Sequence, residues 1–284
     1  MTTGSFGIVR WGVAAALGMT TLAAQAPDER AAMPAAPKLP TLATAQQLFY
    51  DGNYDESAAQ ALTLTTADPD NLAVYELRTS AVLFQLKHAM GDAEDKKKAL
   101  KACVPCPALI TAFLADTTRG QTVARARLKT DGNDDVALFF LGKIDLNYVW
   151  LQLGTLGKRT GWSEYWEARH SLDAVLKRQP AHVRARVARA WIDYIVDTKM
   201  TMGFKWILGG GSKKKALTVM GQAAGTASDF YTQAEARFGL WEMQMREKNV
   251  TAAVVTARDL ARDFPANREV ANFLKNPNAT RAER

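Results

Sequence analysis

The part of this sequence with the clearest potential for chemistry is FKWILGGGSKKKAL at residues 204–217. Three glycines, a serine and three lysines could hold an anion, because free backbone N–H groups and lysine charges both attract phosphate. A nucleotide-binding loop, however, needs Gly-x-x-x-x-Gly-Lys followed by Ser or Thr after a strand. Here Ser212 precedes Lys213 and no strand pattern lies upstream, so we expect Ser212 to be the N-cap of a helix. The sequence leaves two positions open for Lys213, Lys214 and Lys215: a groove, where they would select an acidic partner, or open solvent.

The two cysteines, Cys103 and Cys106, lie three residues apart in KACVPCPAL. A Cys-x-Pro-Cys run resembles thioredoxin-like redox centres, in which a helix N-terminus lowers the pKa of the first thiol. No strand pattern precedes this run and a second proline follows it, so we expect a structural disulfide that fixes a turn between two helices. An exchanging redox pair, a metal site and unpaired thiols are the alternatives, although two thiolates supply only half of a zinc site.

Other residue types that serve catalysis are sparse. His88, His170 and His182 have no metal-ligand spacing such as HExxH, so we expect them at the surface or in helix packing. The chain has no Gly-x-Ser-x-Gly elbow. The sequence therefore predicts no catalytic residue, no metal and no cofactor, and we expect a protein that is not an enzyme.

Aromatic residues are more informative, because five of the seven tryptophans lie between residues 150 and 206. They either fill the space between long helices or line a central hydrophobic pocket that takes a small apolar ligand or an aromatic peptide side chain. Both interpretations can hold together. The residues that we expect to contact a ligand or partner are Tyr148, Trp150, Trp162, Trp166, Trp191, Tyr194, Trp206, Lys213, Lys214 and Lys215.

The elements that carry these residues have helical periodicity. Residues 71–90, 133–153 and 163–178 place apolar side chains three and four apart, as a one-sided helix requires. Turn-forming residues separate such segments, and we expect about a dozen helices and no strand. The expected helix pairs lie near residues 41–67, 70–102, 105–129, 133–179, 181–225 and 229–264, with a short capping helix after Asn267.

Several of these segments share a repeated pattern. In residues 52–69 a glycine turn is followed by Tyr54, by small residues in ESAAQALTLTTA and by a closing Pro69. Residues 249–265 and, more loosely, 161–180 repeat the pattern. The pattern resembles the second helix of a tetratricopeptide repeat (TPR). The resemblance implies an all-α superhelical stack of antiparallel helix pairs, a TPR-like α-solenoid with degenerate repeats, whose concave surface holds a peptide or another protein.

The N-terminus has a different composition. One arginine precedes WGVAAALGMTTLAAQA, whose small-x-small ending is typical of a secretory signal peptide. We expect a signal peptide over residues 1–26 with cleavage after Ala26, a flexible linker over 27–40, the helical repeat domain over 41–275 and a flexible tail over 276–284. The apolar run is too short for a comfortable membrane span. The predicted location is therefore the bacterial periplasm or the exterior, with no stable membrane insertion after cleavage.

These observations favour a non-catalytic exported scaffold that binds a protein or peptide partner in the cell envelope. The formal net charge of +7 is compatible with an acidic partner, but export argues against nucleic acid. The alternative is a periplasmic binding component that holds a small apolar ligand in an aromatic-lined central cavity. A thiol-based enzyme that uses Cys103 and Cys106 is the third hypothesis.

Overall fold

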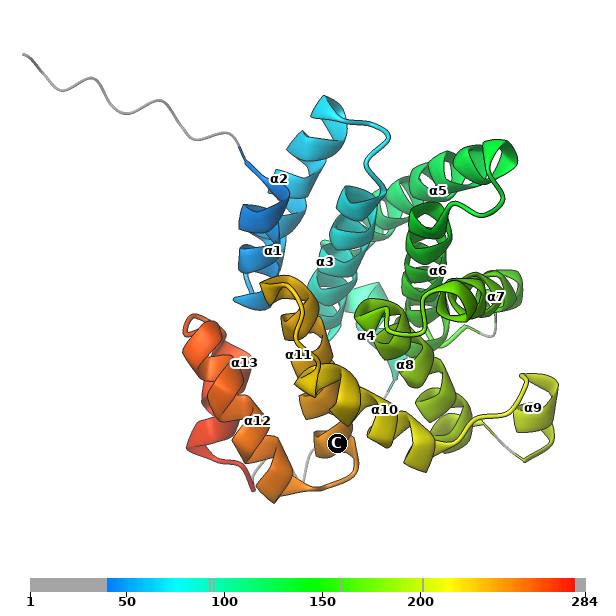
Figure 1. Cartoon of the computed structure of the whole chain (residues 1–284). Coiled ribbons are helices and arrows are strands. Elements are labelled where there is room, and N and C mark those ends of the chain that lie inside the picture. The colour runs from blue at the N-terminus through cyan, green and yellow to red at the C-terminus, as the bar shows by residue number, and fades with distance from the viewer. Residues whose placement is uncertain (1–39, 92, 94, 159, 201, 279–284) are drawn as a thin grey trace, which may run out of the picture. The chain divides into compact units, whose positions relative to one another are not determined.

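The computed structural model describes residues 40–278 apart from residues 92, 94, 159 and 201. Every regular element within these residues is a helix (Figure 1), which confirms the all-α class. The predicted signal peptide, nearly all of the linker and the last residues of the tail lie outside the described residues. The helices are α1 (Leu42–Tyr50), α2 (Tyr54–Ala67), α3 (Leu72–Met90), α4 (Lys96–Ala102), α5 (Cys106–Thr130), α6 (Asp135–Val149), the π-helix η1 (Trp150–Thr155), α7 (Trp162–Arg178), α8 (Val183–Lys199), α9 (Met202–Ile207), α10 (Lys213–Gly225), α11 (Phe230–Arg246), α12 (Val250–Asp263) and α13 (Arg268–Lys275).

Short polar residues at the turns begin several of these helices. The side chains of Asp134, Ser212 and Asn249 each accept a hydrogen bond from the backbone N–H three residues ahead, at 2.9, 3.3 and 3.3 Å. Such an N-cap stabilises a helix by about 1 kcal/mol, because it satisfies one of the free N–H groups of the first turn. The prediction that Ser212 is an N-cap is confirmed.

The main helices pack against their neighbours in chain order, from α1 on α2 through to α12 on α13. Alternate helices also touch, since α1 contacts α3, α3 contacts α6 and α8 contacts α11. The helices α1, α3, α6, α8 and α11 therefore form an inner set, and α2, α5, α7, α10 and α12 lie outside them (Figure 1).

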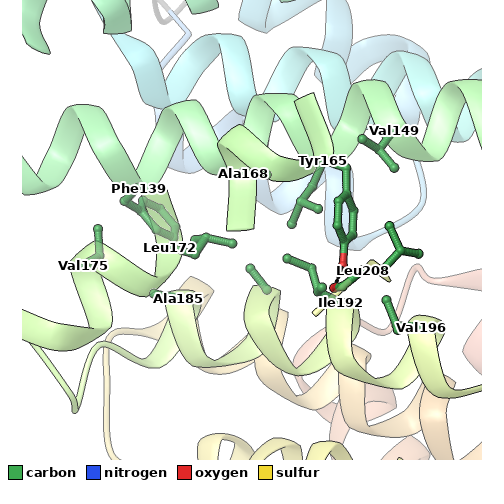
Figure 2. Packing of buried hydrophobic residues seen from close by; sticks show 12 residues of the cluster. Phe139, Val149, Tyr165, Ala168, Leu172, Val175, Ala185, Ile192, Val196 and Leu208 are labelled. Carbon is green, nitrogen blue, oxygen red and sulfur yellow. Dashed lines mark hydrogen bonds between the residues drawn. The ribbon is translucent and has the colours of Figure 1, made fainter. Parts of the chain in front are cut away.

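A hydrophobic core cluster joins α6, α7 and α8 (Figure 2). Phe139 of α6, Leu172 of α7 and Ile192 of α8 are each at most 3% exposed. The hydroxyl of Tyr165 donates a hydrogen bond to the carbonyl oxygen of Leu208 at 2.9 Å, so the loop before α10 is held on the same cluster. Each large side chain buried in this way stabilises the fold by about 1.5–3 kcal/mol. The cluster thus fixes the inner helices α6 and α8 relative to each other.

The predicted helix pair over residues 105–129 is wrong, because α5 is one continuous helix of 25 residues. Gly120 in its middle is a packing position and not a turn. A Cβ atom there would lie 2.7 Å from Ile144 Cδ1 and 3.0 Å from Tyr75 Cβ, so only glycine lets α5 approach α3 and α6 this closely. The chain also forms a helix that the sequence did not indicate, the six-residue α9.

Cys103 and Cys106 form a disulfide at the corner between α4 and α5, with their Cα atoms 5.4 Å apart. The predicted pairing is confirmed. Both side chains pack against a cluster that includes Leu86 and Phe113. The disulfide therefore fixes a helix corner next to the core.

Among the described helices, Asp135–Thr155, which is α6 with η1, is long and apolar enough to cross a membrane. Within that window 61% of the segment is buried inside the bundle. The pair of α4 and α5 passes the same test only if it is taken together across a bend of 104°. The apolar character of α6 is that of a central core helix.

Candidate functional site

A cavity of about 890 Å³ lies between the inner helices. This volume is in the range of sites that hold drug-sized ligands. The inner helices and η1 supply most of the lining, and the beginnings of α2, α7 and α13 complete it. The π-helix takes part directly: Trp150, Leu153 and Gly154 all line the cavity.

Four helices line the cavity with residues on successive turns. The stripes are Glu76, Ser80, Phe84 and Lys87 on α3; Lys143, Asn147, Trp150 and Gly154 on α6 and η1; Arg184, Ala188, Trp191, Ile195 and Lys199 on α8; and Glu235, Phe238, Glu242 and Arg246 on α11. The first residue of every stripe belongs to one cluster of ion pairs. The four helices therefore leave that cluster in the same direction along the cavity wall, and the cavity has a charged floor, an aromatic wall and a charged rim.

The floor is a cluster of two acids and two bases, which we call the charge cluster: Glu76, Lys143, Arg184 and Glu235. Lys143 Nζ lies 2.5 Å from Glu235 Oε1 and 3.4 Å from Glu76 Oε1. Arg184 reaches Glu235 at 2.5 Å and Glu76 at 2.9 Å. Burial alone would raise the pKa of Glu235, but Arg184 and Lys143 lower it to about 2. Burial also opposes the charge of Lys143, yet Glu235 and Glu76 raise its pKa. With two acids and two bases in contact, the charge cluster has no formal net charge.

The wall above the charge cluster is mainly aromatic. Phe84 lies 5.5 Å from Phe49 and 4.9 Å from Tyr54, measured between ring centroids. Trp150, Trp162, Trp191, Phe238 and Trp241 also line the cavity. Ring faces of this kind offer a large apolar surface with defined geometry to a bound molecule.

The two ends of the described chain meet and close one side of the cavity. Tyr50 of α1 lies 5.4 Å from Phe238 of α11 and 5.3 Å from Phe264, between ring centroids. Asn267 Nδ2 donates a hydrogen bond to the carbonyl oxygen of Tyr50 at 2.7 Å. Figure 1 shows α1 beside α11 and α13. These contacts wall off one side of the cavity, which stays partly open to solvent where Lys87, Gly154 and Lys199 are exposed.

The rim carries both signs of charge. Arg246 pairs with Glu242 at 2.8 Å, and its guanidinium lies 5.7 Å from the Trp191 ring centroid. Lys87 Nζ lies 4.6 Å from the centroid of the Phe84 ring, and the residue is exposed. Lys199 and Glu269 complete the charged lining.

Three of the predicted site residues, Trp150, Trp162 and Trp191, line the cavity together. The sequence-based interpretation missed the other half of the wall, which comes from Tyr50, Tyr54, Phe84, Phe238 and Trp241. The repeated three- and four-residue spacing on α3 and α11 is the signal that could have identified Phe84 and Phe238.

Four other predicted aromatic residues do not line the cavity. Tyr148 packs against the core cluster that contains Leu86 and Phe113, and Trp166 stacks on His170 with ring centroids 5.6 Å apart. Tyr194 is 2% exposed, and its hydroxyl donates to Glu247 at 2.8 Å. Trp206, at 85% exposed, stands on the surface of α9. Core filling therefore accounts for three of them, and Trp206 is a surface residue.

The triple-glycine segment is a turn held by an arginine. Gly209 and Gly210 have φ angles of +78° and +72°, which favour glycine, and a Cβ atom on Gly211 would lie 2.5 Å from a backbone oxygen of α8. Arg169 donates hydrogen bonds to the carbonyl oxygens of Leu208 and Gly209 at 3.0 and 2.9 Å. The loop thus presents carbonyl oxygens to a cation, which is the opposite of a phosphate cradle.

The three lysines that follow lie outside the cavity lining. Lys213 Nζ pairs with Glu247 at 2.7 Å, and its backbone N–H donates to Asp197 at 2.8 Å. These acids offset the unfavourable interaction of a lysine with the helix dipole. Lys214 and Lys215 are exposed. The cavity therefore does not use these lysines.

The histidines serve helix packing and capping. His88 bonds to Glu269 at 2.7 Å, and His182 is the N-cap of α8, where its Nδ1 accepts from the N–H of Ala185 at 3.2 Å. Among the described residues, no group of three or more His, Cys, Asp or Glu side chains is arranged to hold a metal ion. Comparisons with models of known protein families and with curated proteins found no match. The cavity and its lining are therefore the features from which a function can be inferred.

Proposed function

We propose that this protein is a non-catalytic binding protein that holds a small, largely apolar molecule in the central cavity. The observation that carries the proposal is the cavity of about 890 Å³ lined by aromatic rings from several helices. Protein interiors are normally packed to crystal-like density, so apolar walls around a space of this size favour an apolar occupant. Each square ångström of apolar surface that such an occupant buries contributes about 25 cal/mol.

The helix order supports the finer assignment to a TPR-like α-solenoid with degenerate repeats. Consecutive helices pair, and α1 packs closely on α2 at Ala45, whose carbonyl oxygen accepts a hydrogen bond from Ser57 Oγ at 2.8 Å. Inner helices that line one common surface are typical of such stacks. In this proposal the contact of Tyr50 with Phe238 and Asn267 closes one side of the usual concave surface.

We also propose that the protein acts in the periplasm or outside the cell, as the predicted signal peptide indicates. The disulfide between Cys103 and Cys106 supports this location, because such bonds persist in oxidising compartments.

A bulky side chain placed in the cavity tests the function. Gly154 lines the cavity, and a Cβ atom there would meet nothing within 4 Å. Gly154→Trp should therefore fill the space without displacing neighbours. Gly221 on α10 has an equally free Cβ position away from the cavity lining, so Gly221→Trp is the matched control.

The measurement is the fluorescence of the neutral probe N-phenyl-1-naphthylamine on titration with each protein. We expect the wild type and Gly221→Trp to bind the probe and Gly154→Trp to bind it at least about tenfold more weakly, a loss of about 1.4 kcal/mol. Circular dichroism checks that both variants stay folded. Unchanged binding by a folded Gly154→Trp protein would reject the cavity as the site.

A protein partner is a second candidate, supported by the surface of α9. Trp206 is 85% exposed and Ile207 is 58% exposed, and large apolar side chains that stand together at a surface are common at protein contacts. In this hypothesis an envelope protein binds α9 and leaves the cavity to the ligand. A pull-down from envelope extract should recover a stoichiometric partner with the wild type and lose it with Trp206→Ala, which should still bind the naphthylamine probe.

A further inference from the structure

We propose that the ligand of the cavity is an anionic amphiphile whose acidic group pairs with Lys87 at the rim. Its apolar body would lie along the aromatic wall towards the charge cluster. This inference rests on the proposed function, because it names the class of molecule that the same cavity selects.

The balance of charge around the cavity is the first argument. Five basic and four acidic side chains line it: Lys87, Lys143, Arg184, Lys199 and Arg246, with Glu76, Glu235, Glu242 and Glu269. The four members of the charge cluster neutralise one another, and Arg246 pairs with Glu242. Glu269 bonds to His88. Lys87 and Lys199 have no ion pair within the described part of the chain, so the rim carries a surplus of positive charge.

The position of Lys87 is the second argument. Its ammonium group lies over the Phe84 ring at 4.6 Å, on the cavity wall. A lysine in the last turn of α3 also interacts favourably with the helix dipole. The side chain of Lys87 is exposed at the rim, so an acidic group of a ligand can reach its ammonium group beside the two carboxylates, Glu242 and Glu269, that also act on its charge.

The charge cluster determines which end of the ligand lies at the floor of the cavity. Lys143 and Arg184 each already contact two carboxylates, so the floor has no cation left for a ligand. Glu76 at the floor and Lys87 at the rim are separated by three turns of α3, about 16 Å along the helix axis. A molecule with one acidic end and an extended apolar body matches this arrangement.

Three ligands with the same chain and different head groups test the inference: decanoate, decan-1-ol and decylammonium. Isothermal titration calorimetry of the wild type should show decanoate binding at least about tenfold more tightly than decan-1-ol, as a charge-assisted hydrogen bond implies. Decylammonium should bind most weakly. Lys87→Met should remove the preference for decanoate and leave the affinity for decan-1-ol unchanged.

Lys177→Met is the matched control, because Lys177 is an exposed lysine in the last turn of α7 and does not line the cavity. It should keep the wild-type order of affinities. Equal binding of decanoate and decan-1-ol by the wild type would overturn the anionic head group but keep the cavity function. Weaker binding of all three ligands by Lys87→Met would show that Lys87 supports the wall and does not bind the acid. Failure of the wild type to bind any of the three chains would reject the proposed function itself.

Discussion

Replacing Glu235 with glutamine tests whether the charge cluster holds the inner helices together. Glu235 of α11 accepts hydrogen bonds from Lys143 of α6 and Arg184 of α8, each at 2.5 Å, and its side chain is 13% exposed. Glutamine keeps the shape of the side chain and removes its charge. Two buried cations would then face Glu76 alone.

The size of the effect follows from the pKa of Glu235 and from the behaviour of buried ion pairs. The pKa of Glu235 falls from 4.5 to about 2, and each unit corresponds to about 1.4 kcal/mol, so the ionised group stabilises the fold by about 3 kcal/mol. Removing one partner of a buried ion pair costs about 3–5 kcal/mol by mutational experience. Because the pKa in the folded protein lies below the value in the unfolded chain, this stability is complete above pH 4.5 and is lost as the pH falls towards 2.

Urea unfolding followed by circular dichroism measures the prediction. At pH 7 the free energy of unfolding of Glu235→Gln should be about 3 kcal/mol lower than that of the wild type. The difference should shrink as the pH falls from 4.5, where the carboxylate of the unfolded wild-type chain takes up a proton, towards 2, where the carboxylate of the folded protein does so as well. The double variant Glu235→Gln with Lys143→Met should regain part of the loss, because its cluster is again neutral.

The control is Glu247→Gln, which breaks the more exposed pair with Lys213 and should cost less than about 1 kcal/mol. A loss in Glu235→Gln no larger than in this control would refute the reasoning. Simple additivity of the Glu235 and Lys143 substitutions would refute it as well, since it would mean that the two charges do not interact.

Three further predictions follow from other parts of the fold. Burial and then the charge of Glu167 raise the pKa of Asp145 from 3.8 to about 8, so the wild type should lose stability as the pH rises through this window. Asp145→Asn should remove that loss. Equal free energies of unfolding of the wild type at pH 5 and pH 8 would contradict this prediction. Gly211→Ala should lower the free energy of unfolding by about 1–3 kcal/mol, because its Cβ atom would lie 2.5 Å from a carbonyl oxygen of α8, whereas Gly221→Ala in the middle of α10 should raise it by about 0.5–1 kcal/mol; thermal unfolding compares the two. Alkylation without reductant should label neither cysteine of the native protein, and mass spectrometry that finds both labelled would contradict the disulfide.

The helices could be predicted because their signals are local. A one-sided apolar pattern and a capping residue such as Ser212 lie within the few residues that form the element. The error over 105–129 has a non-local cause, since the reason for Gly120 is the approach of Ile144 and Tyr75 from two other helices. Periodicity within one helix carries no information about that distance.

The site could be predicted only in part for the same reason. Trp162 and Trp166 lie one turn apart on α7, yet only Trp162 lines the cavity, because α7 is an outer helix whose first turn alone reaches it. The contact between Tyr50 and Asn267 joins positions 217 residues apart. No pattern along the chain indicates such a contact, so the sequence alone does not group the aromatic residues of α1, α2 and α11 with the central tryptophans.

The charge cluster connects the stability of the fold with the shape of the cavity. Each of α3, α6, α8 and α11 contributes one charged residue to the cluster, and an uncharged residue follows on the next turn of the cavity face: Ser80, Asn147, Ala188 and Phe238. Sliding one of these helices by a turn would move its charge away from two partners and leave it buried and unpaired, at a cost of several kcal/mol. We infer that the two acids and two bases set the register of α3, α6, α8 and α11, so that Phe84, Trp150 and Trp191 come to one level of the wall. A variant that loses the charge cluster but stays folded should hold Phe84, Trp150 and Trp191 less firmly in place, and it should therefore bind an apolar ligand more weakly.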